Sequence, residues 1–186
     1  MDHDSYTYTF KICLFADRNV GKDTFFKTLS KSSNYKDTID YYRNTTGVNF
    51  AVKEVEIHDL KLQFWIFSDM QIYGIRFANL RDMYVKGACG VILMYDITNV
   101  KTLNRLSEWC KMVKKYSVDI PILLVGNKLD LEDNREVSKE QAEKFKEDND
   151  ISSWMEISLK TGHNVEKMFL NVASLTLNNY LKREGK

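Results

Sequence analysis

The 186-residue sequence lacks any apolar run that approaches the ~20 residues needed to span a bilayer. It also lacks a strong charge of either sign. Its formal net charge is +1, which gives no reason to expect nucleic-acid binding. The first residues, Met1-Asp2-His3-Asp4, are acidic and polar, so we expect no signal peptide. What remains is a hydrophobic content of 44% and a charged content of 28%, typical of one soluble globular domain.

Cysteine is scarce as well. Cys13, Cys89 and Cys110 are widely spaced, and no Cys-x-x-Cys pair or nearby histidine accompanies them. This spacing argues against a zinc site. Two of the three cysteines fall in apolar segments, so we expect reduced thiols in the core of a protein from a reducing compartment.

Apolar periodicity divides the chain into alternating strands and helices. Strands are expected at 8–16, 48–57, 61–67, 90–95, 120–126 and 154–158, and helices at 22–32, 102–116, 138–147 and 165–181, with a weakly helical stretch at 72–86. The second and third strands flank a short turn and predict a hairpin. Ser138 and Gln141 form a capping-box pattern. The order predicts an α/β fold with a mainly parallel sheet, helices on both faces and one antiparallel edge strand.

Polar turns follow several of these strands directly, at 17–21, 68–71, 127–130 and 158–160. Ligands of such sheets bind outside the carboxyl ends of the strands. We therefore expect these turns to converge on one crevice.

The most informative turn is Asn127-Lys128-Leu129-Asp130, which follows the apolar run 122–125. The carboxylate of Asp130 can accept two hydrogen bonds, from the N1–H and the exocyclic amine of guanine. Adenine has no such donor pair and would leave a buried acceptor unpaired, at roughly 1–3 kcal/mol or more. The turn therefore predicts guanine recognition, and a solvated turn after a buried strand is the alternative.

From about Phe10 to Tyr180 the chain resembles a Rab-like small GTPase of the Ras superfamily. The resemblance is carried by Val20-Gly21-Lys22, Thr45-Thr46-Gly47-Val48-Asn49-Phe50, Leu62-Gln63-Phe64-Trp65, the run from Gly90 to Thr98, Asn127-Lys128-Leu129-Asp130 and Ser158-Leu159-Lys160. It implies the P-loop NTPase fold of a small GTPase G domain, with a six-stranded, mainly parallel sheet and helices on both faces. We expect this domain to span residues 8–182, between tails at 1–7 and 183–186.

The base-binding end matches the family pattern well. The candidate contacts are Tyr35, Asn127, Lys128, Asp130, Ser158, Leu159 and Lys160. The resemblance implies that Asn127 and Asp130 fix the guanine and that the Lys128 stem packs along it. The backbone N–H of Leu159 would donate to the guanine O6, and Tyr35 is the candidate for stacking on the base.

The phosphate end departs from the pattern. The P-loop motif G-x-x-x-x-G-K-[ST] runs here from Ala16 to Asp23, with Gly21 and Lys22 retained. The candidate phosphate contacts are Asn19, Val20, Gly21, Lys22, Asp23 and Thr24. Asp23 replaces the Ser or Thr that ligates Mg²⁺, and a carboxylate ~4 Å from a phosphate costs roughly 4 kcal/mol at an effective dielectric of 20 unless a metal lies between. Alternatively, Asp23 only favours the helix dipole. Asp23 and Thr45 are the candidate metal ligands.

Three more family positions are replaced after the strand at 61–67. Ile66 stands where the family has the Asp that holds Mg²⁺ through water. Asp69 replaces the Gly whose amide meets the γ-phosphate, and Met70 replaces the Gln that orients the attacking water. The sequence therefore offers no catalytic residue, and it argues against the Mg²⁺ ion that the resemblance implies.

We expect a protein that binds GDP or GTP with weak or absent hydrolysis, as a regulatory switch or scaffold in trafficking or signalling. Two alternatives stay open: an active GTPase with rewired Mg²⁺ coordination, and a nucleotide-free pseudo-GTPase that serves as an interaction module. Protein effectors or regulators would dock on the switch regions 36–50 and 66–82. The chain ends Lys182-Arg183-Glu184-Gly185-Lys186 without a cysteine, so no lipid anchor is visible. We expect a cytoplasmic monomer that reaches membranes only through partners.

Overall fold

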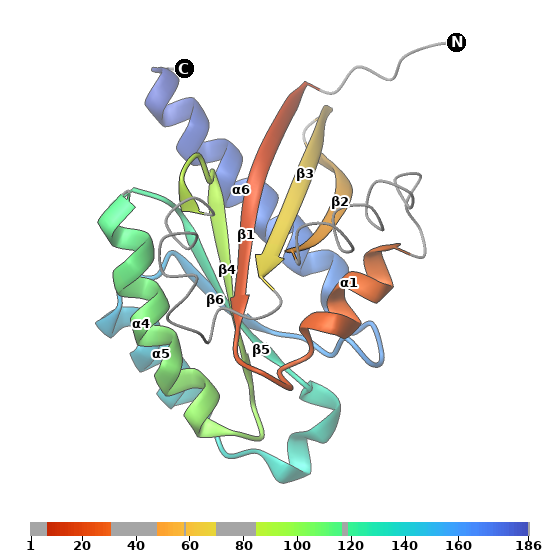
Figure 1. The fold of residues 1–186 in the computed structure, drawn as a ribbon, viewed down its shortest axis with the longest axis vertical. Coiled ribbons are helices and arrows are strands. Elements are labelled where there is room, and N and C mark those ends of the chain that lie inside the picture. The colour runs from red at the N-terminus through yellow and green to blue at the C-terminus, as the bar shows by residue number, and fades with distance from the viewer. Residues whose placement is uncertain (1–6, 31–47, 58, 70–84, 117–118, 186) are drawn as a thin grey trace.

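A six-stranded sheet forms the centre of the computed structural model, which describes residues 7–30, 48–57, 59–69, 85–116 and 119–185 (Figure 1). Its strands are β1 (Tyr8–Ala16), β2 (Val48–Ile57), β3 (Leu60–Asp69), β4 (Gly90–Asp96), β5 (Ile122–Asn127) and β6 (Ser153–Glu156). Their order across the sheet is β2-β3-β1-β4-β5-β6, and only the β2–β3 pair is antiparallel within it. The predicted fold class, with one antiparallel edge strand, is confirmed.

Helices cover both faces of the sheet. They are α1 (Lys22–Ser30), α4 (Val100–Tyr116), α5 (Lys139–Asp148) and α6 (Val165–Glu184), with a 3-10 segment η2 (Leu129–Asn134) after β5. The apolar side chains of α1 and α6 share one core cluster with the sheet, and those of α4 and α5 share another. Alternation along β1 builds both clusters, because Ile12 and Leu14 enter the first while Cys13 and Phe15 enter the second.

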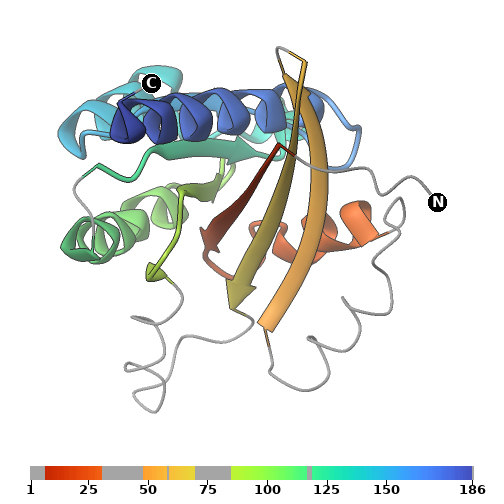
Figure 2. The same ribbon diagram turned by 90° about the horizontal axis from the view of Figure 1, so that it is seen from above.

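The predicted hairpin and capping box are both confirmed. β2 and β3 run side by side as a long antiparallel hairpin (Figure 2). At the start of α5, the Gln141 backbone N–H donates to the Ser138 hydroxyl at 3.2 Å, and the Ser138 backbone N–H donates to the Gln141 side-chain oxygen at 2.8 Å. Two N–H groups that a helix start leaves without partners are thereby satisfied.

Element boundaries differ from the predicted ones by a few residues. The last strand, β6, stops at Glu156, because the chain turns there and the Ser158 backbone N–H donates to the His163 carbonyl at 3.1 Å. The last helix, α6, continues to Glu184. The stretch 72–86, predicted as weakly helical, lies outside the described residues except at its end.

The cysteines behave as core thiols where the sequence predicted them. Cys13 and Cys110 are buried, and neither forms a disulfide. Burial raises the pKa of the Cys13 thiol to about 12 and that of Cys110 to about 11, so both stay protonated at neutral pH. None of the described helices combines the length and the apolar composition that a membrane span requires.

Candidate nucleotide-binding site

The carboxyl ends of the parallel strands place the predicted turns beside one another. In Figure 1 the arrowhead of β1 leads into the turn that precedes α1. Side-chain contacts join this turn to the loops after β5 and β6, so the predicted convergence is confirmed for these three turns. The segment 70–71 of the fourth turn lies outside the described residues.

The side chain of Asn127, at the end of β5, holds three loops together. Its Nδ2 donates to the Val20 carbonyl at 2.7 Å, and its Oδ1 accepts from the Leu159 backbone N–H at 3.1 Å. Asn127 is 3% exposed, so both bonds lie in the interior. The amide keeps one further N–H to offer to a base. Because the Leu159 N–H already has an acceptor, its predicted bond to the guanine O6 would have to be shared and stays a prediction.

The turn between β1 and α1 has the backbone geometry of an anion-binding nest. Asn19 and Gly21 take positive φ values of 63° and 120°. A Cβ at Gly21 would overlap the Asn127 side-chain amide, so only glycine fits this close approach. The Phe25 backbone N–H donates to the Gly21 carbonyl at 2.9 Å in the first turn of α1, which begins at Lys22. Loop N–H groups and a helix N-terminus together can hold phosphate oxygens.

The carboxylate of Asp130 is oriented by the loop after β6. The Ser158 hydroxyl donates to Asp130 Oδ1 at 2.6 Å, and Lys160 Nζ lies 3.6 Å from Oδ2. The Ser158 hydrogen bond, with a smaller contribution from Lys160, lowers the pKa of Asp130 below its ordinary value. Asp130 is therefore ionised at neutral pH and can accept a pair of hydrogen bonds from guanine.

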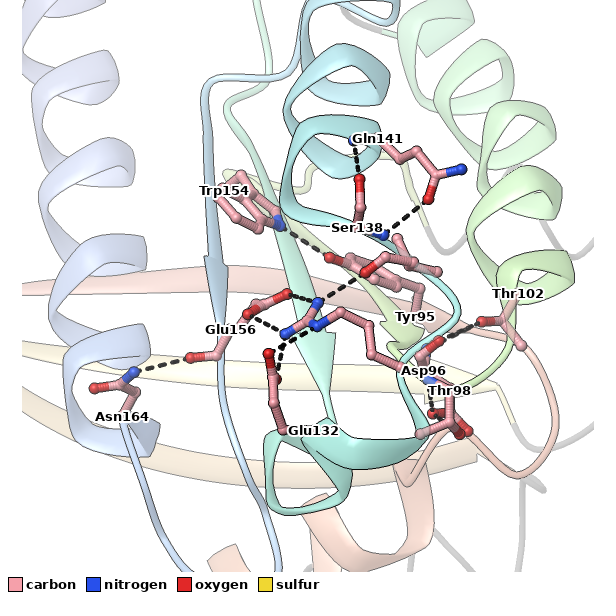
Figure 3. Close-up of polar contacts among 12 residues, drawn as sticks. Tyr95, Asp96, Thr98, Thr102, Glu132, Ser138, Gln141, Trp154, Glu156 and Asn164 are labelled. Carbon is pink, nitrogen blue, oxygen red and sulfur yellow. Dashed lines mark hydrogen bonds and ion pairs between the residues drawn. The ribbon is translucent and has the colours of Figure 1, made fainter.

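Lys128 is anchored by a residue that sequence reasoning did not single out. Lys128 takes a left-handed conformation with φ 71°, and its Nζ lies 2.5 Å from Asp96 Oδ2. Asp96 is the last residue of β4 and is itself buried, and its other oxygen accepts from the Thr98 backbone N–H and hydroxyl at 2.9 and 2.7 Å (Figure 3). The sequence feature that could have identified Asp96 is its place at a strand end, in the run Tyr95-Asp96-Ile97-Thr98.

Arg135 ties η2 to β6 through ion pairs and thereby supports the turn 127–130. Its guanidinium bonds both oxygens of Glu156, at 2.6 and 2.9 Å, both oxygens of Glu132, at 3.0 and 2.5 Å, and the Val137 carbonyl at 2.8 Å (Figure 3). These carboxylates raise the pKa of Arg135, and the guanidinium lowers that of Glu132. Sequence reasoning missed the pairing of Arg135 with Glu156, because no local pattern links residues 21 positions apart.

The metal end of the site offers no ligand set among the described residues. Ile66 is 1% exposed and belongs to the core cluster beneath α1 and α6. Asp23 and Thr24 are exposed in the first turn of α1. No group of three or more His, Cys, Asp or Glu side chains suited to a metal occurs in the described segments. Ile66 cannot ligate the Mg²⁺ ion that the resemblance implies, and Asp23 as a metal ligand stays a prediction. Tyr35, Thr45, Met70 and the Asp69 side chain lie outside the description.

Comparison with known proteins matches nearly the whole chain. A model of the Ras family matches residues 11–178. The chain is 35% identical over 169 residues to Ras-related protein Rab-12 of Mus musculus, an alignment that covers 89% of this chain and 66% of that protein. It is 34% identical over 172 residues to Rab-8A of Rattus norvegicus and 33% identical over the same length to Rab-8B of Homo sapiens, with 91% of this chain and 79% of each relative covered. The chain thus spans just under two thirds of the length of Rab-12.

The two buried hydrogen bonds of the Asn127 side chain, which brace the three loops, predict an effect on stability that does not depend on a ligand. Asn127→Ala leaves the Val20 carbonyl and the Leu159 N–H without partners, which should lower the free energy of unfolding by roughly 1–3 kcal/mol for each group. Urea unfolding of nucleotide-free protein measures this loss. Asp130→Ala, in the same turn, removes contacts nearer the surface and should cost much less. Equal losses in the two variants would contradict the role of Asn127 as a brace.

The Asp130 contacts predict a change in titration. Ser158→Ala removes the main cause of the lowered pKa, so the Asp130 pKa should rise toward its ordinary value, whereas Lys160→Ala should raise it less. A carboxylate with a lowered folded pKa adds stability above its unfolded pKa and loses it as the pH falls through the folded pKa. In Ser158→Ala this contribution should therefore be smaller, and its loss should be complete at a higher pH than in the wild type. Carbon-13 NMR titration of the Asp130 carboxyl checks both shifts, and the reverse order of the two variants would refute the assignment.

Proposed function

Because the chain belongs to the Ras family of small GTPases and is Rab-like, we propose that it binds a guanine nucleotide, GDP or GTP, and hydrolyses GTP weakly or not at all. The observation that carries the proposal is the Asp130 carboxylate, held by the Ser158 hydroxyl at 2.6 Å. Its two oxygens can accept from the N1–H and the exocyclic amine of guanine, and adenine offers no such pair of donors. The Asn19 and Gly21 nest and the start of α1 suit the phosphates.

Weak hydrolysis is inferred from the replaced positions. Phosphoryl transfer depends almost entirely on positioning and on neutralising charge. Ile66 is enclosed in the core and can ligate nothing, Asp23 brings a negative charge to the start of α1, and Met70 cannot orient a water molecule. These replacements support binding without efficient turnover, and they make a nucleotide held without Mg²⁺ the favoured form.

A second function, that of an interaction module in trafficking or signalling, is favoured by an exposed aromatic side chain on the hairpin. Trp65 on β3 is 42% exposed, and its ring packs edge-on against the buried Phe50 of β2, which also contacts the half-buried Phe67. These three residues fall within or beside the regions 36–50 and 66–82 proposed for effectors and regulators. An indole held in place by aromatic neighbours is a typical anchor for a protein partner.

Analysis of copurified nucleotide tests the main proposal directly. The purified protein is denatured and the released nucleotide is identified by chromatography, and the remaining protein is loaded with GDP, GTP or ATP, with and without EDTA. We expect guanine nucleotide and no adenine nucleotide. Failure to bind GDP or GTP in either condition would reject the proposal in favour of the interaction module.

Exchanging the hydrogen-bonding character of Asp130 should exchange the preferred base. Asp130→Asn replaces an acceptor with a donor, which opposes the guanine N1–H and amine but can meet the 2-oxo group of xanthine. Loss of one charged hydrogen-bond pair costs roughly 1.5–3 kcal/mol, or about 10- to 100-fold in affinity. Competition between GDP and xanthosine diphosphate measures the switch. Unchanged preference would show that Asp130 does not read the base.

Removing the Asp23 charge should tighten nucleotide binding in EDTA. A carboxylate ~4 Å from a phosphate costs between about 1 kcal/mol in water and about 4 kcal/mol at an effective dielectric of 20, so Asp23→Ser should gain roughly 5- to 1000-fold in GDP affinity. Asp119→Ser, which removes an exposed charge near the start of β5, is the matched control. Weaker binding, together with phosphate release that Asp23→Ala abolishes, would instead support a GTPase with rewired metal coordination.

A further inference from the structure

An ion pair between a buried carboxylate and a largely exposed guanidinium joins the phosphate loop to α4. Asp17, the first residue after β1, is 5% exposed, and its carboxylate pairs with the guanidinium of Arg105 in the second turn of α4. The other carboxylate oxygen accepts from the Arg18 backbone N–H at 2.7 Å. One oxygen of Asp17 therefore fixes the backbone at the start of the loop, and the other ties it to a helix 88 residues further along the chain.

The surroundings of this pair are cationic. A hollow of about 450 Å³ lies between the loop and α4, lined by Asp17, Arg18, Asn19, Asn99, Lys101, Thr102 and Arg105. Three cationic side chains thus face one carboxylate. Loss of Arg105 would leave Asp17 buried without this cation, immediately before the backbone groups that the proposed function assigns to phosphates.

We propose that Arg105 is a positioning residue for the phosphate loop. Through Asp17 it holds residues 17–21 in the conformation that suits an anion, and it cancels the Asp17 charge beside that site. The inference deepens the proposed function and rests on it for the binding readout. The Asp17–Arg105 ion pair would then supply part of the loop ordering. Mg²⁺ and a neutral hydroxyl, in place of the Asp23 carboxylate, would otherwise supply it.

If Arg105 acts by compensating the charge of Asp17, removing that charge should reverse the effect of losing Arg105. A purely structural contact would not be restored in this way. Breaking a buried pair by removing one partner leaves an uncompensated charge, whereas removing both charges does not. Asp17→Asn keeps an oxygen that can accept from the Arg18 N–H while it removes the negative charge. The substitution Asp17→Asn should therefore rescue Arg105→Ala.

GDP binding measures this reversal. Arg105→Ala should weaken GDP binding about tenfold or more, because the anion then meets a carboxylate that has lost the guanidinium paired with it. The double variant Asp17→Asn/Arg105→Ala should return to within about threefold of the wild type, and Arg105→Lys should retain most of the affinity. Lys114→Ala is the matched control: it removes a cation from the same helix, where Lys114 pairs with the exposed Asp150 at 3.3 Å, and should leave GDP binding unchanged.

Amide hydrogen exchange provides a readout without nucleotide. In nucleotide-free protein, the amides of residues 18–21 should exchange faster in Arg105→Ala than in the wild type or in Lys114→Ala. Unchanged exchange in Arg105→Ala, or a double variant that binds GDP as weakly as Arg105→Ala, would overturn the proposal. A wild-type protein that binds no GDP would reject the proposed function instead, and the exchange measurement would still decide whether Arg105 orders the loop.

Discussion

At the carboxyl edge of the sheet, the Asn127 amide donates to the Val20 carbonyl and accepts from the Leu159 backbone N–H. One buried side chain thereby sets the spacing of the loops that follow β1, β5 and β6. The spacing leaves no room for a Cβ at Gly21. Because these bonds form within the protein itself, the three loops proposed to contact the base and the phosphates are held in register without a ligand. Preorganisation of this kind reduces the ordering cost of binding.

Recognition and catalysis separate along the length of the site. Near the base, Asp130 and Lys128 are each tied to a partner on another loop, Ser158 and Asp96. At the start of α1, Lys22 is retained, whereas Asp23 brings a negative charge and Ile66 offers no ligand. In the proposed function, such a protein would change state through binding and release of nucleotide rather than through bond cleavage.

The sequence predicted what depends on local patterns. Period-two alternation located β1 and the hairpin, helical spacing located α4 and α6, and the Ser138–Gln141 pattern located the start of α5. It did not predict the pairs Asp17–Arg105 and Glu156–Arg135. Each pair joins charged residues far apart in the chain, and in sequence such residues resemble solvated surface charges. Only the strand order and the packing of helices on the sheet bring them together.

The burial of Ile66 makes a metal-binding carboxylate costly at this position. The side chain lies beneath α1 and α6 and sits opposite Ile12 and Ala51 on the neighbouring strands. An acidic residue at this position would place a carboxylate among apolar side chains, at a cost of several kcal/mol. The neighbouring packing would therefore have to change before position 66 could carry a metal ligand.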